Sequence, residues 1–282
     1  MAHNKNPNRR KALKSGLAAF AISTLKTNPL LAQKKAPGET RVIFLVGDYF
    51  HNPITQEKNW RSVLRPTGWK LLFARATQFV TPEVLSETDL FVVARYAKAN
   101  SIGWSPDKLT DELLDEVPFL TDERERTIIE NVHRGMGLLA MHCTVWNGER
   151  KDFMRLLGVQ EPHMHTKIQP ALLHQLNPNH PITKGIEPDN LGEDEIFSAD
   201  LIPGETGHLF NLKGEEQPID TTGGWCREPG KGRVVALLPG HTPSPFHSKS
   251  FKEIMWRSAY WAMKKDIAPH EFTDGRPAEN AK

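Results

Sequence analysis

The sequence is short of cysteine, of net charge and of long hydrophobic runs. Its two cysteines cannot form a disulfide framework, although Cys143 and Cys226 could pair once. A formal net charge of +2 supplies no basic surface for nucleic acid. The apolar stretch near the N-terminus, residues 15–25, is too short for a stable bilayer anchor, and no cysteine lies near it to carry a lipid. We therefore expect neither a nucleic-acid partner nor a stable membrane anchor.

The first forty residues, 1–40, are predicted to be an export signal and a linker rather than part of the fold. A charged segment containing Arg9 and Arg10 precedes the apolar stretch, which is typical of an export signal. The arginine pair resembles the twin-arginine signal that carries folded proteins across the bacterial inner membrane, although Ala12 stands where that signal usually has Phe. We expect an exported, periplasmic bacterial protein. The alternative is a disordered basic tail.

Residues 41–266 are predicted to form one domain, and residues 267–282 a loose polar tail, because the sequence shows no internal repeat and no second linker. Apolar runs alternate with helical segments in the first half of this domain, and strands are expected at 41–47, 69–75 and 89–95 and within the stretch 134–146, before His142. This alternation favours an α/β fold with a doubly wound, mostly parallel sheet and helices on both faces. Residues 97–118, which include Trp104 and an acidic run, are interpreted as an insertion or lid.

The pattern changes after residue 146. Extended pieces alternate there with loops rich in Pro, Asn and Gly, and only two further helices are expected. The sequence predicts a helix at 149–157, a strand at 168–176, an extended piece beginning at 193–197, a hairpin of 222–227 and 232–238, and an amphipathic helix at 250–263.

Three of the predicted strands are followed by a histidine. In open parallel sheets ligands bind outside the carboxyl ends of the strands, so we expect His51, His142 and His241 to face one crevice. Histidine and carboxylate together can bind a divalent metal or divide acid and base roles, and Glu195 and Asp194 are the carboxylates best placed by context. The candidate catalytic residues and metal ligands are therefore His51, His142, His241 and Glu195. Three unrelated core histidines are the alternative.

Four pieces of the sequence, in this order, resemble the trehalose-utilisation (ThuA-like) family. They are GMGLLAMH at 135–142, NHPITKG at 179–185, DEIF at 194–197, and a segment at 230–262 that runs from GKGRVV through GHTP to YWA. The resemblance covers residues 42–262. It implies the flavodoxin-like fold of the class I glutamine amidotransferase-like superfamily. His165 also matches a histidine that the family carries after its central helix, and with His163 it has a spacing that suits metal ligands. His180, in a His-Pro turn, is interpreted as structural.

The sequence departs from the amidotransferase pattern at the catalytic elbow. That fold normally places a nucleophilic cysteine after the central strand, whereas His142 takes the position here and Cys143 comes one residue late. The His-Pro-Glu end of the triad is also missing, because His241 is followed by Thr242 and Pro243. A one-residue shift at a sharp elbow changes where the side chain points. Both departures argue against glutamine hydrolysis and leave Cys143 as an outside candidate for a nucleophile.

The resemblance implies a role in sugar catabolism, on keto-sugars or keto-glycosides made by a partner sugar dehydrogenase. A keto group acidifies the neighbouring C–H, so a His or Glu base could remove that proton while a metal or an imidazolium holds the enolate oxygen. Isomerisation and β-elimination both use this step, so we expect an isomerase or lyase with a carbohydrate substrate. Aromatic and polar side chains near the strand ends are its candidate substrate contacts. They are Tyr49, Trp146, His165 and Asp194, with Trp104 as a further candidate for stacking on a sugar ring.

Two other classes of function remain open from the sequence. One is a metal- or Cys-dependent hydrolase on the same scaffold. The other is a non-catalytic carbohydrate-binding accessory protein, because a fold alone does not confer activity. Perturbed titration of the crevice histidines would favour an enzyme, and its absence a binding protein.

Overall fold

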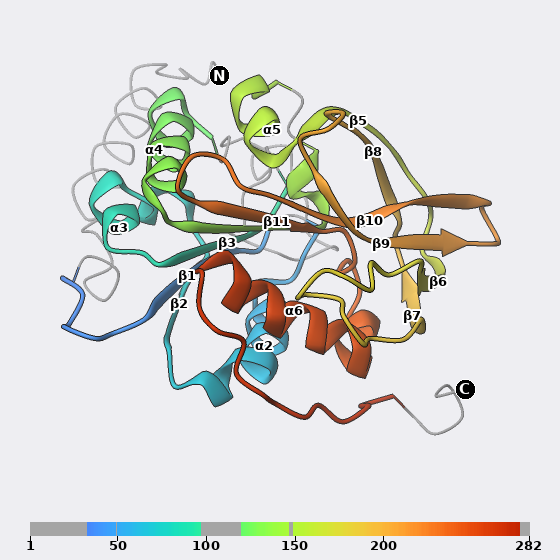
Figure 1. Cartoon of the computed structure of the whole chain (residues 1–282). Coiled ribbons are helices and arrows are strands. Elements are labelled where there is room, and N and C mark those ends of the chain that lie inside the picture. The colour runs from blue at the N-terminus through green and yellow to red at the C-terminus, as the bar shows by residue number, and fades with distance from the viewer. Residues whose placement is uncertain (1–32, 49, 97–119, 147–148, 277–282) are drawn as a thin grey trace, which may run out of the picture.

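The computed structural model describes residues 33–48, 50–96, 120–146 and 149–276, in which a nine-stranded mixed sheet forms the centre of the molecule (Figure 1). The strand order is β2-β1-β3-β4-β11-β10-β9-β6-β7, and the strands from β2 to β11 are parallel to one another. These strands are β2 (Lys70–Ala74), β1 (Arg41–Val46), β3 (Leu90–Ala94), β4 (Gly137–Met141) and β11 (Arg233–Leu237).

Antiparallel strands extend the sheet beyond β11 and form what we call the wing. The wing consists of β10 (Ile219–Arg227), β9 (Gly207–Gly214), β6 (Gln169–His174) and β7 (Asp189–Asp194). A separate two-stranded sheet pairs β5 (Val159–His165) with β8 (Phe197–Leu201). Glu195 lies at the corner where the chain leaves β7 for β8, so the wing and the small sheet together determine its position.

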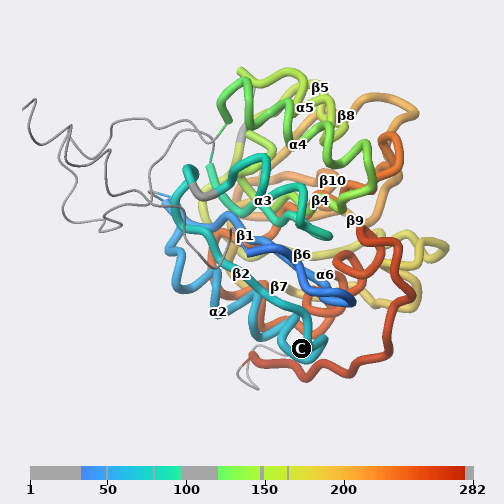
Figure 2. Tube along the Cα trace, turned by 90° about the vertical axis from the view of Figure 1, so that its left-hand side faces the viewer, coloured from blue at the N-terminus to red at the C-terminus, as the bar shows by residue number. Residues whose placement is uncertain are grey.

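Helices cover both faces of the parallel strands. In Figure 1, α3 (Pro82–Ser86), α4 (Asp122–Arg134) and α5 (Lys151–Leu157) lie on one face, and α2 (Pro53–Leu64) and α6 (Lys249–Ala262) lie on the other. Figure 2 shows the same layers from the side. The longer helices begin at capping side chains, since Asn52, Thr121 and Ser248 each accept a hydrogen bond from a backbone N–H of the first turn.

The parallel strands are apolar along their length because both of their faces are covered. Every residue of β1, β3 and β4 is buried. Phe44 of β1 packs against Trp60 of α2 and stacks on Phe73 of β2, with ring centroids 5.3 and 4.3 Å away. This packing fixes the carboxyl ends of the strands as a rigid edge on which side chains can be placed.

The structure confirms the α/β fold with parallel strands and helices on both faces. It also confirms the hairpin, as β10 and β11 pair antiparallel. The predicted insertion or lid at 97–118 and most of the predicted signal, residues 1–32, lie outside the described residues. Within the part of the chain that the structure describes, no helix is both long and apolar enough to cross a membrane.

The segment after α6 forms neither helix nor strand as far as residue 276, but it packs against α6. Trp256 donates from Nε1 to the carbonyl oxygen of Ala268 at 2.9 Å and stacks on His270, with ring centroids 4.7 Å apart. Phe272 is buried, and Arg276 forms an ion pair with Asp189 at 2.8 Å. This part of the predicted loose tail is therefore in contact with the domain.

Candidate functional site

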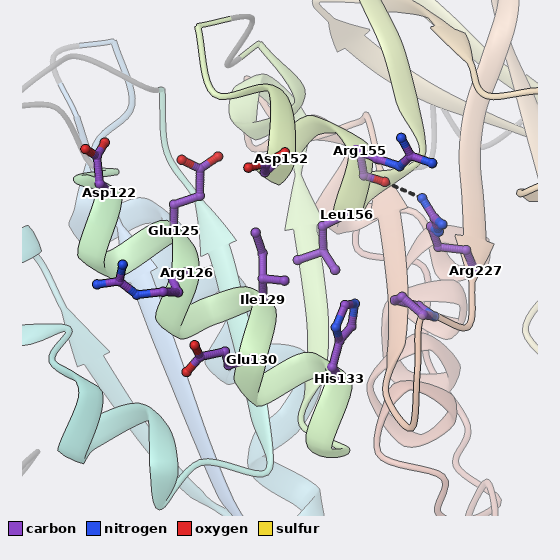
Figure 3. Close-up of a pocket in the computed structure, with 11 residues that line it drawn as sticks. Asp122, Glu125, Arg126, Ile129, Glu130, His133, Asp152, Arg155, Leu156 and Arg227 are labelled. Atoms are coloured by element: carbon purple, nitrogen blue, oxygen red, sulfur yellow. Dashed lines mark hydrogen bonds between the residues drawn. The ribbon is translucent and has the colours of Figure 1, made fainter.

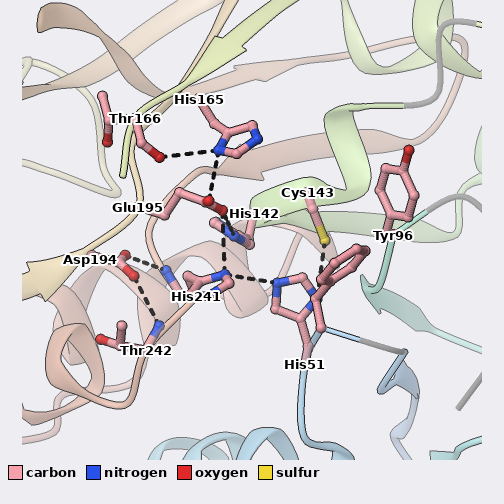
Figure 4. Close-up of polar contacts among 12 residues, drawn as sticks. His51, Tyr96, His142, Cys143, His165, Thr166, Asp194, Glu195, His241 and Thr242 are labelled. Atoms are coloured by element: carbon pink, nitrogen blue, oxygen red, sulfur yellow. Dashed lines mark hydrogen bonds and ion pairs between the residues drawn. The ribbon is translucent and has the colours of Figure 1, made fainter. Parts of the chain in front are cut away.

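The histidines that follow β1, β4 and β11 meet at the carboxyl edge of the parallel strands (Figure 4). His51 Nε2 lies 3.2 Å from His241 Nδ1, although 190 positions separate the two residues. One nitrogen from each of His51, His142 and His241 lies within 4.8 Å of the others. His51 and His142 are buried, and His241 is partly exposed. The three histidines predicted to share a crevice are thus neighbours.

His142 occupies a sharp corner between β4 and a short 3₁₀ turn, His142–Val145. Its φ of 48° lies in the left-handed region, which is uncommon for a residue other than glycine. Neighbouring strands hold the corner in place. His142 Nδ1 lies 2.9 Å from the carbonyl oxygen of Leu238, and Thr144 Oγ1 donates to the carbonyl oxygen of Val93 at 2.9 Å. The imidazole of His142 therefore projects from the elbow at a fixed angle.

Asp48 contacts the His51 ring and fixes its orientation. Its buried carboxylate lies 2.8 Å from His51 Nδ1 and accepts hydrogen bonds from the backbone N–H groups of Phe50 and Tyr96 at 2.7 and 2.6 Å. Burial raises the pKa of Asp48, but the hydrogen bond and charge of His51 and the backbone donors outweigh burial, so the pKa lies below its usual value. The carboxylate thus links the ends of β1 and β3 beneath the histidines.

Glu195 is the carboxylate at the centre of the histidine group. Its Oε2 atom lies 3.3 Å from His142 Nε2 and 3.3 Å from His241 Nδ1, and its Oε1 atom lies 2.7 Å from His165 Nδ1 (Figure 4). Burial raises the pKa of Glu195, but the contact with His142 and the electrostatic effect of the His142, His241 and His165 rings lower it further than burial raises it. Glu195 is therefore ionised at neutral pH.

A second buried carboxylate holds the loop that carries His241. Asp194 accepts hydrogen bonds from the backbone N–H groups of Gly240 and Thr242 at 2.7 and 2.9 Å. Each of its two oxygens accepts one of these hydrogen bonds from the loop, and its side chain is buried. Asp194 is not among the residues that line the cavity, and the expected contact of Asp194 with a substrate stays a prediction.

His241 is a neutral imidazole over the physiological pH range. Burial and the neighbouring imidazoles of His142 and His51 lower the pKa of His241 to about 4. A histidine with so low a pKa keeps a nitrogen lone pair available at neutral pH. Perturbed titration of this kind favours a functional site over a set of unrelated core histidines.

The histidine group opens into a cavity of about 300 Å³ with aromatic walls. Trp146 contacts the rings of His165 and Phe197 edge-on, with centroids 5.7 and 5.5 Å apart. Phe50, another lining residue, contacts Tyr96 edge-on, with ring centroids 5.9 Å apart. The cavity is lined by Phe50, His51, Tyr96, Cys143, Trp146, His165, Glu195, Phe197 and His241. A cavity of this size and composition suits a small polar molecule with apolar faces.

A larger hollow of about 630 Å³ lies between α4 and α5, away from this chemistry (Figure 3). Ile129 and Leu156 form its apolar floor, and charged side chains of both signs surround them. Arg227 donates a hydrogen bond to the carbonyl oxygen of Arg155 at its rim. The hollow contains one histidine, His133, and none of the strand-end residues, so we place the candidate site in the smaller cavity.

Cys143 lines the cavity floor but is poorly suited to nucleophilic attack. Its Sγ atom lies 3.7 Å from His51 Nδ1, a nitrogen that is already engaged by Asp48. Burial, followed by the charges of Asp48 and Glu195, raises the pKa of the Cys143 thiol well above its usual value. The thiol is therefore protonated at neutral pH, whereas a nucleophile needs the thiolate.

The remaining candidates lie outside the cavity or outside the described residues. Cys143 and Cys226 are both free, and Cys226 Sγ lies 3.4 Å from His180 Nε2, so His180 fills a structural position. His163 forms an ion pair with Asp200 at 2.8 Å and takes no part in the His165 contact with Glu195. Tyr49 and Trp104 lie outside the described residues.

One nitrogen of the site stands out as a candidate metal ligand. His142 Nδ1 faces a carbonyl oxygen, which only accepts, so Nδ1 carries the proton and Nε2 carries a lone pair when the ring is neutral. Among the described residues Nε2 is buried and has no hydrogen-bond partner, although Glu195 Oε2 lies 3.3 Å from it. His51, His142 and His241, with Glu195 beside them, form a nitrogen-rich donor set of the kind that binds Zn²⁺ and related divalent cations.

Comparisons with known proteins agree with the fold. The family model described as trehalose utilisation (ThuA) matches residues 41–262. No curated protein sequence matches the chain. A ThuA-like protein from Parabacteroides merdae ATCC 43184 superposes with a TM-score of 0.65 at 14% identity, covering 82% of this chain and 92% of that one. A ThuA-like protein from Bacteroides uniformis ATCC 8492 gives 0.63 at 14% identity, with 83% and 96% covered.

The same fold occurs as part of a larger enzyme. The β-galactosidase from Rahnella sp. R3 superposes with a TM-score of 0.56 at 12% identity, over 81% of this chain and 32% of that one. At these identities the likeness concerns the fold alone.

Proposed function

The chain belongs to the trehalose utilisation (ThuA) family, and from this premise we propose that it is an enzyme of sugar catabolism that removes a proton beside the keto group of a keto-sugar or keto-glycoside. The single observation that carries the proposal is the position of the Glu195 carboxylate. It lies among three imidazoles at the wall of an aromatic cavity. A base, an imidazole group that fits a divalent cation and apolar walls for a sugar ring are thus present in one place.

Each polar residue has a role that its contacts support. Glu195 accepts the proton from the carbon, because it is ionised and lies at the cavity wall. His165, whose side chain is 48% exposed, contacts the other oxygen of Glu195 at 2.7 Å and passes the proton to and from solvent. The aromatic lining residues Trp146, Phe197, Phe50 and Tyr96 hold the sugar ring and exclude water.

The donor set fits a divalent cation, and His51, His142 and His241 would hold it. The unpartnered Nε2 of His142 and the neutral state of His241 support this fit. A bound cation would supply Lewis-acid stabilisation of negative charge on the substrate oxygen. The three imidazoles would fix the position of the cation. His51 and His142 are buried, so water would screen the attraction between the cation and the substrate oxygen only weakly.

Deuterium exchange tests the proposal whichever product the enzyme forms. The probes are methyl glucosides oxidised to the ketone at carbon 2, 3 or 4, incubated in D₂O with the purified protein before and after chelation. Mass spectrometry counts the carbon-bound deuterium gained by each probe or its product. We expect exchange at a carbon beside the ketone, faster than with heat-inactivated protein. Equal rates with native and heat-inactivated protein for every probe would contradict the proposal and favour a non-catalytic binding protein.

Cys143 provides the test against the Cys-dependent hydrolase. Cys143→Ser is expected to retain most of the exchange rate, because the thiol is buried, protonated and lacks a free base. Iodoacetamide should also leave Cys143 unmodified in the folded protein and alkylate it after denaturation, as read by peptide mass spectrometry. A loss of several orders of magnitude in the serine variant would instead identify the thiol as the nucleophile.

We further propose that the protein is exported through the twin-arginine route, on the basis of Arg9 and Arg10 ahead of the apolar stretch. Replacing both arginines with lysine keeps the charge and removes the pair, so the variant should remain in the cytoplasm of a bacterial host. Fractionation and immunoblotting of wild type and variant measure the distribution. Unchanged export of the lysine variant would count against this route.

A further inference from the structure

Asp48 is the one buried carboxylate, among the described residues, that contacts a strand-end histidine without lining the cavity. The two carboxylate oxygens are both 2.8 Å from His51 Nδ1. Oδ1 also accepts the backbone N–H groups of Phe50 and His51, at 2.7 and 3.0 Å, and Oδ2 accepts that of Tyr96 at 2.6 Å. Both oxygens of this carboxylate are therefore engaged by donors.

The bonding pattern leaves His51 a single favourable tautomer. An ionised carboxylate only accepts hydrogen bonds, so a ring nitrogen that is hydrogen-bonded to it must carry a proton. Nε2 is then the nitrogen with the lone pair when the ring is neutral. It points away from Asp48 and lies 3.2 Å from His241 Nδ1, on the cavity side of the ring.

We propose that Asp48 is a positioning residue that holds His51 with its proton on Nδ1, so that the lone pair of Nε2 faces the cavity. A different acceptor does the same for His142, whose Nδ1 faces the carbonyl oxygen of Leu238. The buried imidazoles of His51 and His142, which follow β1 and β4, then both carry the lone pair on Nε2 when neutral. The arrangement is what a site that binds an electron-poor centre requires, since a proton on either Nε2 atom would repel it.

Asp194 shows that not every buried carboxylate of the site works in this way. It accepts hydrogen bonds from the backbone N–H groups of Gly240 and Thr242, which position the loop of His241. Among the described residues, no hydrogen bond joins its side chain to a histidine ring. Asp194 therefore affects where His241 lies, whereas Asp48 affects which nitrogen of His51 carries the proton.

The first experiment reads the tautomer in the wild-type protein. Protein labelled with ¹⁵N at histidine is treated with chelator and studied at pH 8 by a two-dimensional experiment that correlates ring nitrogens and carbon-bound hydrogens. Protonated and unprotonated ring nitrogens resonate far apart, and His51→Gln identifies the His51 signals. We expect a proton on Nδ1 and a lone pair on Nε2. The reverse assignment would overturn the proposal.

The second experiment replaces Asp48 with asparagine. Both carboxylate oxygens accept from the backbone, so the amide NH₂ is expected at the position of Oδ2, where one such bond is lost rather than two. There the NH₂ faces His51 Nδ1 and favours the tautomer with the ring proton on Nε2. We expect this tautomer in the spectrum of Asp48→Asn. We also expect Zn²⁺ affinity, measured by titration calorimetry of the chelator-treated protein, to fall about 10- to 100-fold. A folded variant in which both the His51 tautomer and the Zn²⁺ affinity match the wild type would overturn the proposal.

Asp89→Asn is the matched control. Asp89 also accepts from a backbone N–H of β1, that of Arg41 at 2.8 Å, but at the opposite end of the strand. Its replacement should cost stability without altering the His51 spectrum or Zn²⁺ affinity. If Asp48→Asn fails to fold, the wild-type spectrum alone decides. The affinity result rests on the proposed function, whereas the tautomer does not, so failure of the deuterium-exchange assay would leave the spectral test intact.

Discussion

Glu195→Gln is expected to slow deuterium exchange into the keto-glucoside probes by about 10²- to 10⁴-fold, the range that a positioned general base contributes. Glutamine has nearly the same shape and can keep a contact with His165, but it cannot accept a proton from carbon. The low pKa of Glu195 makes the carboxylate available at neutral pH in the wild type. The rate is followed by mass spectrometry at saturating probe, so that a change in binding is separated from a change in the proton-transfer step.

Glu193→Gln is the matched control for this variant. Glu193 lies two residues earlier on β7 and its side chain is exposed, so its replacement removes the same charge without touching the cavity. We expect wild-type exchange from it. A Glu195→Gln variant that folds normally and exchanges at the wild-type rate would show that another group is the base.

His142→Asn should lower the affinity for Zn²⁺ by more than the roughly 100-fold that loss of an outer partner can cost, because it removes a direct ligand. Asparagine is chosen since it tolerates the left-handed backbone of this corner better than most residues do, which limits the effect on the fold. Calorimetry measures the affinity. A melting experiment adds a second readout, because a cation that binds only the folded state raises the unfolding temperature.

His163→Asn serves as the control for His142→Asn. His163 pairs with Asp200 and lies away from the strand-end histidines, so the substitution leaves the donor set complete. Both its Zn²⁺ affinity and the Zn²⁺-induced rise in melting temperature should match the wild type. If His142→Asn binds Zn²⁺ as tightly as this control does, the three histidines do not form the cation site.

The parallel half of the sheet is predictable because its strands are continuous apolar runs. The strands β1, β3 and β4 are buried on both faces, and such strands leave an unbroken signal. The meeting of His51 and His142, each of which comes after one of these runs, then follows from topology alone. The order of strands and loops is thus enough to predict that His51 and His142, which are distant in the sequence, lie close together.

The wing and the details of the site are much less accessible from sequence. β7 is a polar strand with Asn190 and Gly192, and the sequence does not predict β9. In both strands exposed or half-buried residues interrupt the buried ones, so no continuous apolar run is left. The role of Asp48 depends on where Phe50 and Tyr96 place their backbone N–H groups, which requires coordinates. The aromatic wall formed by Phe197 depends on the pairing of β8 with β5. Neither contact leaves a local sequence signal.

The 190-residue separation between His51 and His241 also bears on how the protein folds. Closing so long a loop is entropically costly, and contacts of this kind form only after more local structure exists. His51 can be in place once the first strands pair, but Glu195 and His241 arrive only with β7 and β11, from the last third of the chain. A partly folded chain would therefore hold the early histidine without its partners. Capture of a cation by the site would then mark the completion of folding rather than its beginning.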